Sequence, residues 1–175
     1  MEETIRTTSA HVVKQMMKFV DLQFGDDILE PSAGYGDLLD HIQEGPYIKY
    51  PQHVVDCVEL NTRRREVLRS KGYNIVGSNF LEFKTDKLYD WVIAAPNSVN
   101  SVDIEHVIQM HRFTKSGGTI VSLMDPIWMI KEEQIHKKFR EWIKDKDYKM
   151  VMLEDYSFIE KCKTRPTIII VIKKY

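Results

Sequence analysis

The sequence contains few cysteines and carries almost no net charge, and each shortage excludes a class of protein. Its two cysteines, Cys57 and Cys162, fit neither a disulfide framework nor a zinc-binding spacing, so we expect both to be free thiols. The 25 Lys and Arg residues nearly cancel the 26 Asp and Glu residues, which leaves no global basic field to hold a nucleic-acid backbone. A polyanionic partner would have to bind a local patch or a partner protein.

Long apolar runs are also missing. None approaches the roughly 20 residues that span a bilayer, and the N-terminal segment lacks the layout of a signal peptide, so we expect a cytoplasmic protein with no membrane partner. Apolar residues are nevertheless abundant: 43% of the 175 residues are hydrophobic and 10% are aromatic. This composition excludes disorder, and the length indicates one domain over residues 1–175.

Helix-like and strand-like patterns alternate along the chain, which is typical of an α/β domain with a mostly parallel sheet. We predict strands at residues 26–30, 53–60, 73–77, 88–95, 119–124, 148–153 and 167–172. We predict helices at residues 9–21, 37–42, 62–71, 102–113 and 131–145. No helix separates the last two strands, so the final strand can run antiparallel to the rest of a seven-stranded sheet.

The segment DILEPSAGYGD, residues 27–37, passes from a strand through a glycine turn into a helix. Gly34 and Gly36 lack Cβ atoms, which allows a sharp turn and close approach of a ligand. Glu59 ends the next strand, 23 residues after Gly36, close to the spacing of about 20 at which an acidic residue binds a ribose. A tight turn without a ligand is the alternative, but Glu59 favours a nucleoside-containing cofactor.

The identity of the cofactor follows from two further positions. A dinucleotide needs a third glycine three residues after the second, and that position is Leu39. Glu30, just ahead of the glycines, suits a cofactor with a positively charged amino-acid end better than one with a diphosphate. Together these positions favour S-adenosyl-L-methionine.

Several motifs resemble those of one enzyme family in order and spacing. LEPSAGYGDLL (29–39) resembles the first motif of class I methyltransferases, in particular the bacterial and phage N6-adenine DNA methyltransferases, and VELN (58–61) resembles their ribose-binding motif. RTTSAHVVKQMM (6–17) and SNFLEF (78–83) are similar to the family's opening helix and adenine-contacting motif, and residues 103–124 to a later helix, Gly-Gly turn and strand. The resemblance implies a Rossmann-like class I methyltransferase fold.

The resemblance also implies which residues bind the cofactor, with Glu59 at the ribose and Asn79 and Phe80 at the adenine. The implied cofactor-binding residues are Thr8, Glu30, Pro31, Ser32, Ala33, Gly34, Gly36, Glu59, Leu60, Asn79, Phe80 and Ala95. None of the six histidines has a neighbour at a metal-ligand spacing, so we expect no metal.

The fourth motif departs from the family. Where the adenine methyltransferases have Asn-Pro-Pro followed by Phe or Tyr, this chain has Ala95, Pro96, Asn97 and Ser98. In the family the amide and a backbone carbonyl accept the hydrogens of the target amine, and the aromatic ring stacks on the flipped base. Ala95 has no amide and Ser98 cannot stack, a loss of about 1–3 kcal/mol for the stacking alone. Pro96, Asn97 and Ser98 are therefore the catalytic candidates of an altered motif.

Three functions stay open at this point. An active adenine-N6 methyltransferase of nucleic acid would take its amide from Asn97 and its stacking face from Tyr35, Trp91 or Trp128. A non-catalytic protein would bind S-adenosyl-L-methionine as a partner or regulatory subunit, and a third alternative would methylate a substrate other than a base. Turn formation by Asn97 and core packing by Trp91 are the purely structural interpretations.

Residues 154–166, EDYSFIEKCKTRP, are the candidate contact with nucleic acid. Basic side chains lie close to Tyr156 and Phe158, a combination that binds single strands, although a solvated hairpin fits equally well. A protein partner or a homodimer also stays open. The predicted elements use nearly all of the 175 residues, so we expect no separate target-recognition domain.

Overall fold

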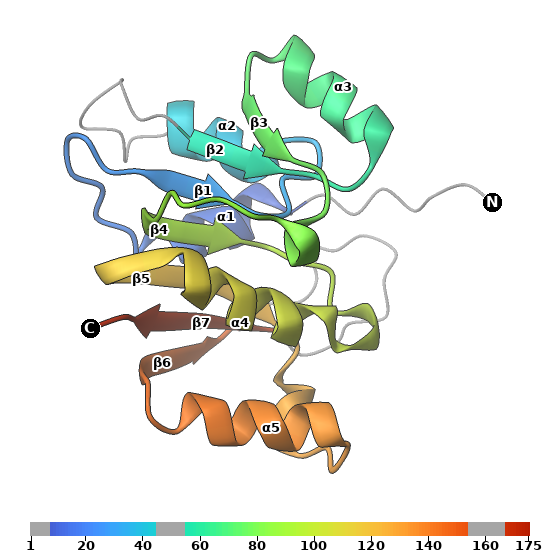
Figure 1. Ribbon diagram of the computed structural model, residues 1–175, viewed down its shortest axis with the longest axis vertical. Helices are drawn as coiled ribbons and strands as arrows, with labels where there is room; N and C mark the ends of the chain where they lie inside the picture. The colour runs from blue at the N-terminus through green and yellow to red at the C-terminus, as the bar shows by residue number, and fades with distance from the viewer. Residues whose placement is uncertain (1–7, 45–54, 154–166) are drawn as a thin grey trace.

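The computed structural model describes residues 8–44, 55–153 and 167–175, and these form a seven-stranded sheet of order β3-β2-β1-β4-β5-β7-β6 (Figure 1). The strands are β1 (Ile28–Glu30), β2 (Val55–Val58), β3 (Asn74–Gly77), β4 (Tyr89–Ala94), β5 (Thr114–Met124), β6 (Asp147–Met152) and β7 (Ile168–Lys173). The α-helices are α1 (Ala10–Met17), α2 (Asp37–Glu44), α3 (Thr62–Ser70), α4 (Val102–Phe113) and α5 (Gln134–Ile143). The short 3-10 helices are η1 (Phe80–Glu82), η2 (Val99–Ser101) and η3 (Pro126–Met129).

The strand directions confirm the predicted fold class. The pairs β1–β2, β2–β3, β1–β4 and β4–β5 are parallel, whereas β7 runs antiparallel to both β5 and β6. After β1 the chain builds outward to β3 and then returns to place β4 on the other side of β1. Strand order therefore reverses between β1 and β4, which is where open α/β sheets bind their ligands.

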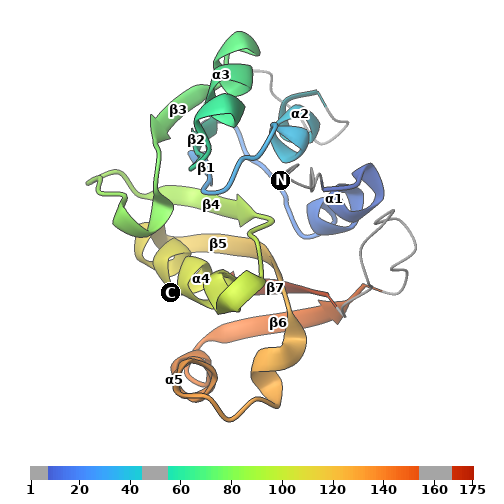
Figure 2. The ribbon, with the colours of Figure 1, turned by 90° about the vertical axis from the view of Figure 1, so that its right-hand side faces the viewer.

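Helices cover both faces of the sheet, and the strand residues alternate between them. Figure 2 shows α1 and α2 on one side of the sheet and α4 and α5 on the other. In β7, Ile169 and Val171 pack on the face that α1, α2 and α3 cover. Ile168, Ile170 and Ile172 pack on the opposite face, against α4 and α5. This arrangement explains why the central strands read as continuous apolar runs.

The two largest differences from the predicted boundaries are the end of α1 and the start of β5. Helix α1 ends at Met17, because the amide N–H groups of Phe19 and Val20 turn back to Met16 and Met17. Strand β5 begins at Thr114, five residues earlier than expected, and the Gly117–Gly118 pair lies inside it. The buried hydroxyl of Thr114 donates to the Met110 carbonyl at 2.8 Å, so the chain passes directly from helix to strand there.

The thiol of Cys57 is free, as predicted, and fully buried in β2. Burial raises its pKa to about 12, with smaller contributions from Glu30, Asp56 and Glu59. A thiol with so high a pKa stays protonated and unreactive at neutral pH. Cys162 lies outside the described residues.

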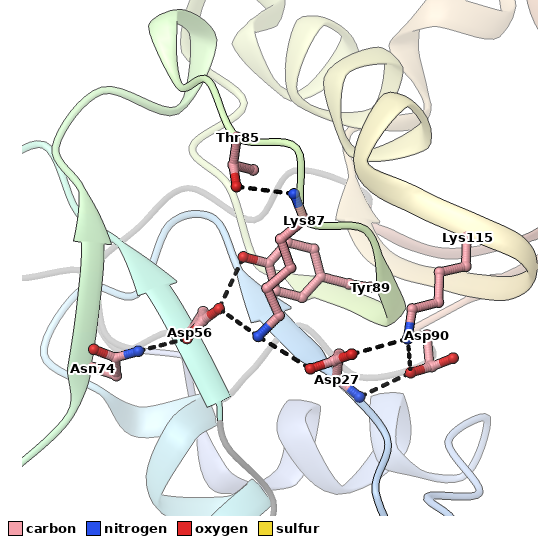
Figure 3. A network of polar contacts seen from close by, with 8 residues as sticks. All are labelled: Asp27, Asp56, Asn74, Thr85, Lys87, Tyr89, Asp90 and Lys115. Carbon is pink, nitrogen blue, oxygen red and sulfur yellow. Dashed lines mark hydrogen bonds and ion pairs between the residues drawn. The ribbon is translucent and has the colours of Figure 1, made fainter.

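A polar network ties together the amino-terminal half of the sheet, opposite the ends where ligands bind (Figure 3). Nζ of Lys87 lies 3.0 Å from Asp27 and 2.9 Å from Asp56, and Nζ of Lys115 lies 2.9 Å from Asp27 and 2.8 Å from Asp90. Burial alone would raise the pKa of Asp27, but hydrogen bonds from Lys115 and Lys87 lower it. The network therefore joins segments at β1, β2, β4 and β5 by charge.

We expect the two lysines of this network to contribute unequally to stability. Asp56 is 5% exposed in its side chain, so Lys87→Met removes a cation from a buried carboxylate and lowers the free energy of unfolding by about 1–3 kcal/mol. Lys115→Met affects carboxylates that are about one-third exposed and costs about 0–1 kcal/mol. Urea denaturation at pH 7 measures both, and equal losses would contradict this assignment.

Candidate functional site

A cavity of about 830 Å³ opens at the carboxyl ends of the central strands. Its volume lies within the range of about 300–1,000 Å³ typical of small-molecule sites. Loops after β1, β2, β3, β4 and β5 line it, together with the start of α1 and the residue before β7. Each predicted site residue except Gly36 is part of its wall: Thr8, Glu30, Pro31, Ser32, Ala33, Gly34, Glu59, Leu60, Asn79, Phe80, Ala95, Pro96, Asn97 and Ser98.

The two glycines after β1 have different roles. Gly34 has a φ of +58° and lines the cavity, so a side chain there would strain the turn. Gly36 has a φ of +92°, and a Cβ atom on it would lie 3.0 Å from Tyr73 and 3.1 Å from Leu68. Gly36 therefore allows α2 to pack closely against the α3–β3 region. Gly36 is not among the described residues that line the cavity, and its contact with a cofactor stays a prediction.

Glu59 joins the two loops that form the centre of the cavity. One carboxylate oxygen accepts the amide N–H of Gly34 at 2.7 Å, and the other accepts that of Asn61 at 2.8 Å. The residue is only 5% exposed, and a guanidinium nitrogen of Arg64 lies 3.9 Å from Oε1. A carboxylate has about four lone-pair directions, so Glu59 keeps acceptor capacity toward the cavity.

Glu30 is a buried acid without a hydrogen bond on one of its oxygens. It ends β1 and lines the cavity at 2% exposure, and its Oε2 has no hydrogen-bond partner among the described residues. Burial raises the pKa of Glu30 well above its ordinary value, and the negative charges of Asp37, Glu59 and Asp40 raise it further. The site therefore favours either a proton on Glu30 or a cation beside it.

We expect Glu30 to make stability depend on pH. Its pKa in the folded protein lies above the unfolded value, so the ligand-free protein loses stability as the pH rises from about 4.5 toward that raised pKa, because the unfolded chain ionises there while folded Glu30 keeps its proton. Glu30→Gln removes this loss. Relative to wild type, the variant should gain stability as the pH rises, by up to about 1.4 kcal/mol for each pH unit. Urea titrations at pH 5, 6.5 and 8, with exposed Glu66→Gln as control, test this; parallel profiles would contradict it.

Aromatic and apolar side chains line the end of the cavity formed by the loops after β2 and β3. Phe80 is 3% exposed, and its ring centroid lies 5.2 Å from that of His106. Leu60, on the loop after β2, is 70% exposed although it borders the cavity. Asn79 uses its Oδ1 to cap η1 by accepting the Leu81 amide at 3.1 Å. The arrangement offers flat apolar surfaces that suit a purine ring.

Residues 95–98 follow the carboxyl end of β4 and line the cavity. Asn97 is exposed, and its Oδ1 accepts the amide N–H of Val99 at 3.0 Å. This hydrogen bond is the Asx turn that the structural interpretation of Asn97 predicts. The amide oxygen that an active site would need therefore already has a partner within the turn.

The aromatic residues suggested as stacking faces lie elsewhere. Tyr35, Trp91 and Trp128 are not among the described residues that line the cavity. Trp91 packs against the α1-side core and donates from Nε1 to Asp26 at 2.9 Å, which confirms its core role. Trp128 is 3% exposed, and its ring meets Phe139 edge-on at 4.9 Å.

His106 also lines the cavity and is not among the site residues predicted from the sequence. It follows Val102, another lining residue, by one turn of α4, and this i to i+4 spacing is visible in the sequence. Burial lowers the pKa of His106 to about 4, so the ring is neutral at pH 7. Its Nδ1 has no hydrogen-bond partner among the described residues.

Charge at the cavity is mostly negative. Glu30, Asp37, Glu59 and Asp125 line it, against Arg64 as the only lysine or arginine of the wall in the described part of the chain. Within the described ranges, no three His, Cys, Asp or Glu side chains are grouped as a metal ion requires. The helices in those ranges are too short or too polar to cross a membrane.

Comparison with solved structures identifies the fold. The methyltransferase subunit of a type I restriction-modification system from Streptococcus thermophilus has a TM-score of 0.77 at 15% identity, over 96% of this chain and 44% of that one. A Listeria monocytogenes protein assigned as a class I S-adenosylmethionine-dependent methyltransferase has 0.71 at 17% identity, over 94% and 58%. Precorrin-6y C5,15-methyltransferase from Geobacter metallireducens has 0.68 at 17% identity, over 99% and 92%.

The fold is therefore the Rossmann-like fold of class I methyltransferases. The chain spans less than two-thirds of the length of the first two structures. No protein-family model matches the sequence, and no curated protein matches it.

Proposed function

We propose that the protein binds S-adenosyl-L-methionine in the cavity and is a methyltransferase that acts on an adenine amine of nucleic acid. The buried Glu30 carboxyl carries this proposal, because it borders the cavity with an oxygen that lacks a partner among the described residues and with a raised pKa. A cationic ligand relieves the cost of ionising such a group. When bound, S-adenosyl-L-methionine supplies a positive charge and an electrophilic methyl group.

The remaining wall residues fit the other parts of this cofactor. Glu59 would accept hydrogen bonds from the ribose hydroxyls with its remaining lone pairs. Leu60, Asn79 and Phe80 would enclose the adenine, and Ala33 and Gly34 would let the main chain approach the amino-acid end. The exposed Leu60 side chain supports this assignment, since an apolar group beside an open cavity gains stability when a ligand covers it.

Cofactor binding can be tested without damaging the fold. Replacing Glu59 would leave two backbone amides without an acceptor, so Leu60→Ala is the sharper variant. We expect it to weaken binding of S-adenosylmethionine about threefold to thirtyfold in calorimetry, because it removes buried methyl groups from the complex. The matched control is Ile130→Ala, which alters an exposed side chain that does not line the cavity. Absence of binding by wild type would refute the proposal.

Two observations support nucleic-acid adenine as the target. The motifs resemble those of N6-adenine DNA methyltransferases, and a similar structure is the methyltransferase subunit of a type I restriction-modification system. The acceptor amine would lose one proton for the methyl group it gains, and the Ala95–Ser98 turn borders the space for it. Contact with nucleic acid through residues 154–166 stays a proposal, because that segment lies outside the described residues.

One observation favours a second function. The Oδ1 atom of Asn97 accepts the Val99 amide, so only one of its two lone pairs remains to orient an amine while the turn stays intact. A protein with this turn would bind the cofactor without methylating, as the partner subunit of another protein or in a homodimer. The acidic cavity wall fits either function, since it matches the cofactor rather than a phosphate backbone.

Methyl transfer to mixed DNA and RNA distinguishes these functions. We expect wild type to label adenine and Asn97→Ala to lose at least about tenfold in rate. Asn97→Asp keeps the acceptor oxygen and the turn but loses the amide N–H groups, so full activity of this variant would show that the N–H groups are not needed. Wild type that binds the cofactor but labels nucleic acid only with an added partner would establish the subunit role, and label on a non-base substrate would replace the adenine assignment.

A further inference from the structure

The turn after the altered motif has an unusual backbone. Asn100 and Ser101 have φ values of 56° and 61°, the only non-glycine residues with positive φ in the described ranges. Side chains disfavour this left-handed conformation, and two in succession persist only where the surroundings hold them. The two residues lie immediately before α4, in the η2 segment that begins at Val99.

A residue from α5 holds this turn in place. The hydroxyl oxygen of Ser101 lies 3.1 Å from Nε2 of His136, which is 35 residues away in sequence and 1% exposed. On the other side of the ring, Nδ1 lies 2.9 Å from a carboxylate oxygen of Glu133, although not in the alignment of a hydrogen bond. A buried ring at the end of a packed helix is a fixed support for a strained turn.

The first residues of the same turn border the cavity. Pro96, Asn97, Ser98 and Val99 line the cavity, and the Asn97 side chain closes the first part of the turn onto Val99. The amide of Ser101 donates to the Ser98 carbonyl at 3.2 Å and closes the second part. Movement of Ser101 would therefore be passed to Asn97 through two linked hydrogen-bonded turns.

A serine, a histidine and a glutamate side by side also suggest a hydrolytic nucleophile, and the local hydrogen bonds argue against it. Such a serine needs free backbone N–H groups that stabilise an oxyanion. The N–H of Ser101 itself donates to the Ser98 carbonyl, and that of Val102 donates to the Val99 carbonyl. Ser101 is also not among the described residues that line the cavity.

We propose that His136 is a positioning residue, which acts through Ser101 to hold the 97–101 turn and so sets the place of Asn97 in the cavity. The inference rests on the proposed function, because Asn97 matters for catalysis only if the cavity serves methyl transfer. It assigns α5, which is not among the described elements that line the cavity, a role in the site.

Hydrogen exchange tests the support directly and needs neither cofactor nor substrate. We expect Ser101→Ala and His136→Leu to speed exchange in peptides covering 97–103 about threefold to tenfold, the factor for losing one hydrogen bond. His136→Gln can place an amide nitrogen near the position of Nε2 and should restore slow exchange in part. Glu141→Gln, on the solvent side of the same helix, is the matched control and should leave exchange unchanged.

Calorimetry and methyl-transfer kinetics complete the test. For Ser101→Ala and His136→Leu, we expect the affinity for S-adenosylmethionine to stay within about twofold of wild type. Their kcat should fall about threefold to tenfold while the KM for S-adenosylmethionine is unchanged. Unchanged exchange in folded Ser101→Ala would overturn the proposal, and so would covalent labelling of Ser101 by a fluorophosphonate. If His136→Leu does not fold, Ser101→Ala decides. Faster local exchange in a protein without methyl transfer would support the positioning of the turn by His136 while refuting the proposed function.

Discussion

The site depends on a single carboxylate that accepts backbone amides from two loops. Glu59 binds the N–H of Gly34 after β1 and that of Asn61 after β2, and it is nearly excluded from solvent. Charge-assisted hydrogen bonds are about twice as strong as neutral ones, so this residue fixes the distance between the loops. The glycine turn, the wall around Glu30 and the exposed Leu60 side chain all take their positions from this link. A residue expected to bind a ribose is thus also structural.

The two ends of the sheet handle charge in opposite ways. At the amino-terminal ends, Lys87 and Lys115 lie between three aspartates, and each aspartate pairs with at least one of them (Figure 3). At the carboxyl ends, Glu30 has no cation paired with it among the described residues, and its pKa is raised by burial and by neighbouring acids. An unbalanced buried acid costs free energy, which the fold tolerates where a ligand can offset the cost. The paired charges that stabilise the fold therefore lie at one end of the strands, and the unpaired acid that a ligand could neutralise lies at the other.

The turn after β4 combines an engaged side-chain amide with a strained backbone. Ala95 stands where the resembled motif has asparagine, and the nearby Asn97 uses its side-chain oxygen in the turn itself. The following left-handed residues, Asn100 and Ser101, are supported by His136 from a helix outside the described cavity wall. Local backbone strain of this kind clusters at functional sites. The turn is consequently the part of the molecule where activity and its absence would be decided.

The sequence alone determined the fold class and most of the cavity wall, because strand patterns, glycine turns and Glu59 act locally and in a fixed order along the chain. It could not place Gly36 away from the cavity, since only the packing of Tyr73 and Leu68 decides which way that turn faces. Nor could it exclude Trp91 and Trp128 as stacking faces or find His106 and His136. These side chains acquire their roles from contacts between residues far apart in sequence, and such contacts exist only once the sheet and its helices have packed.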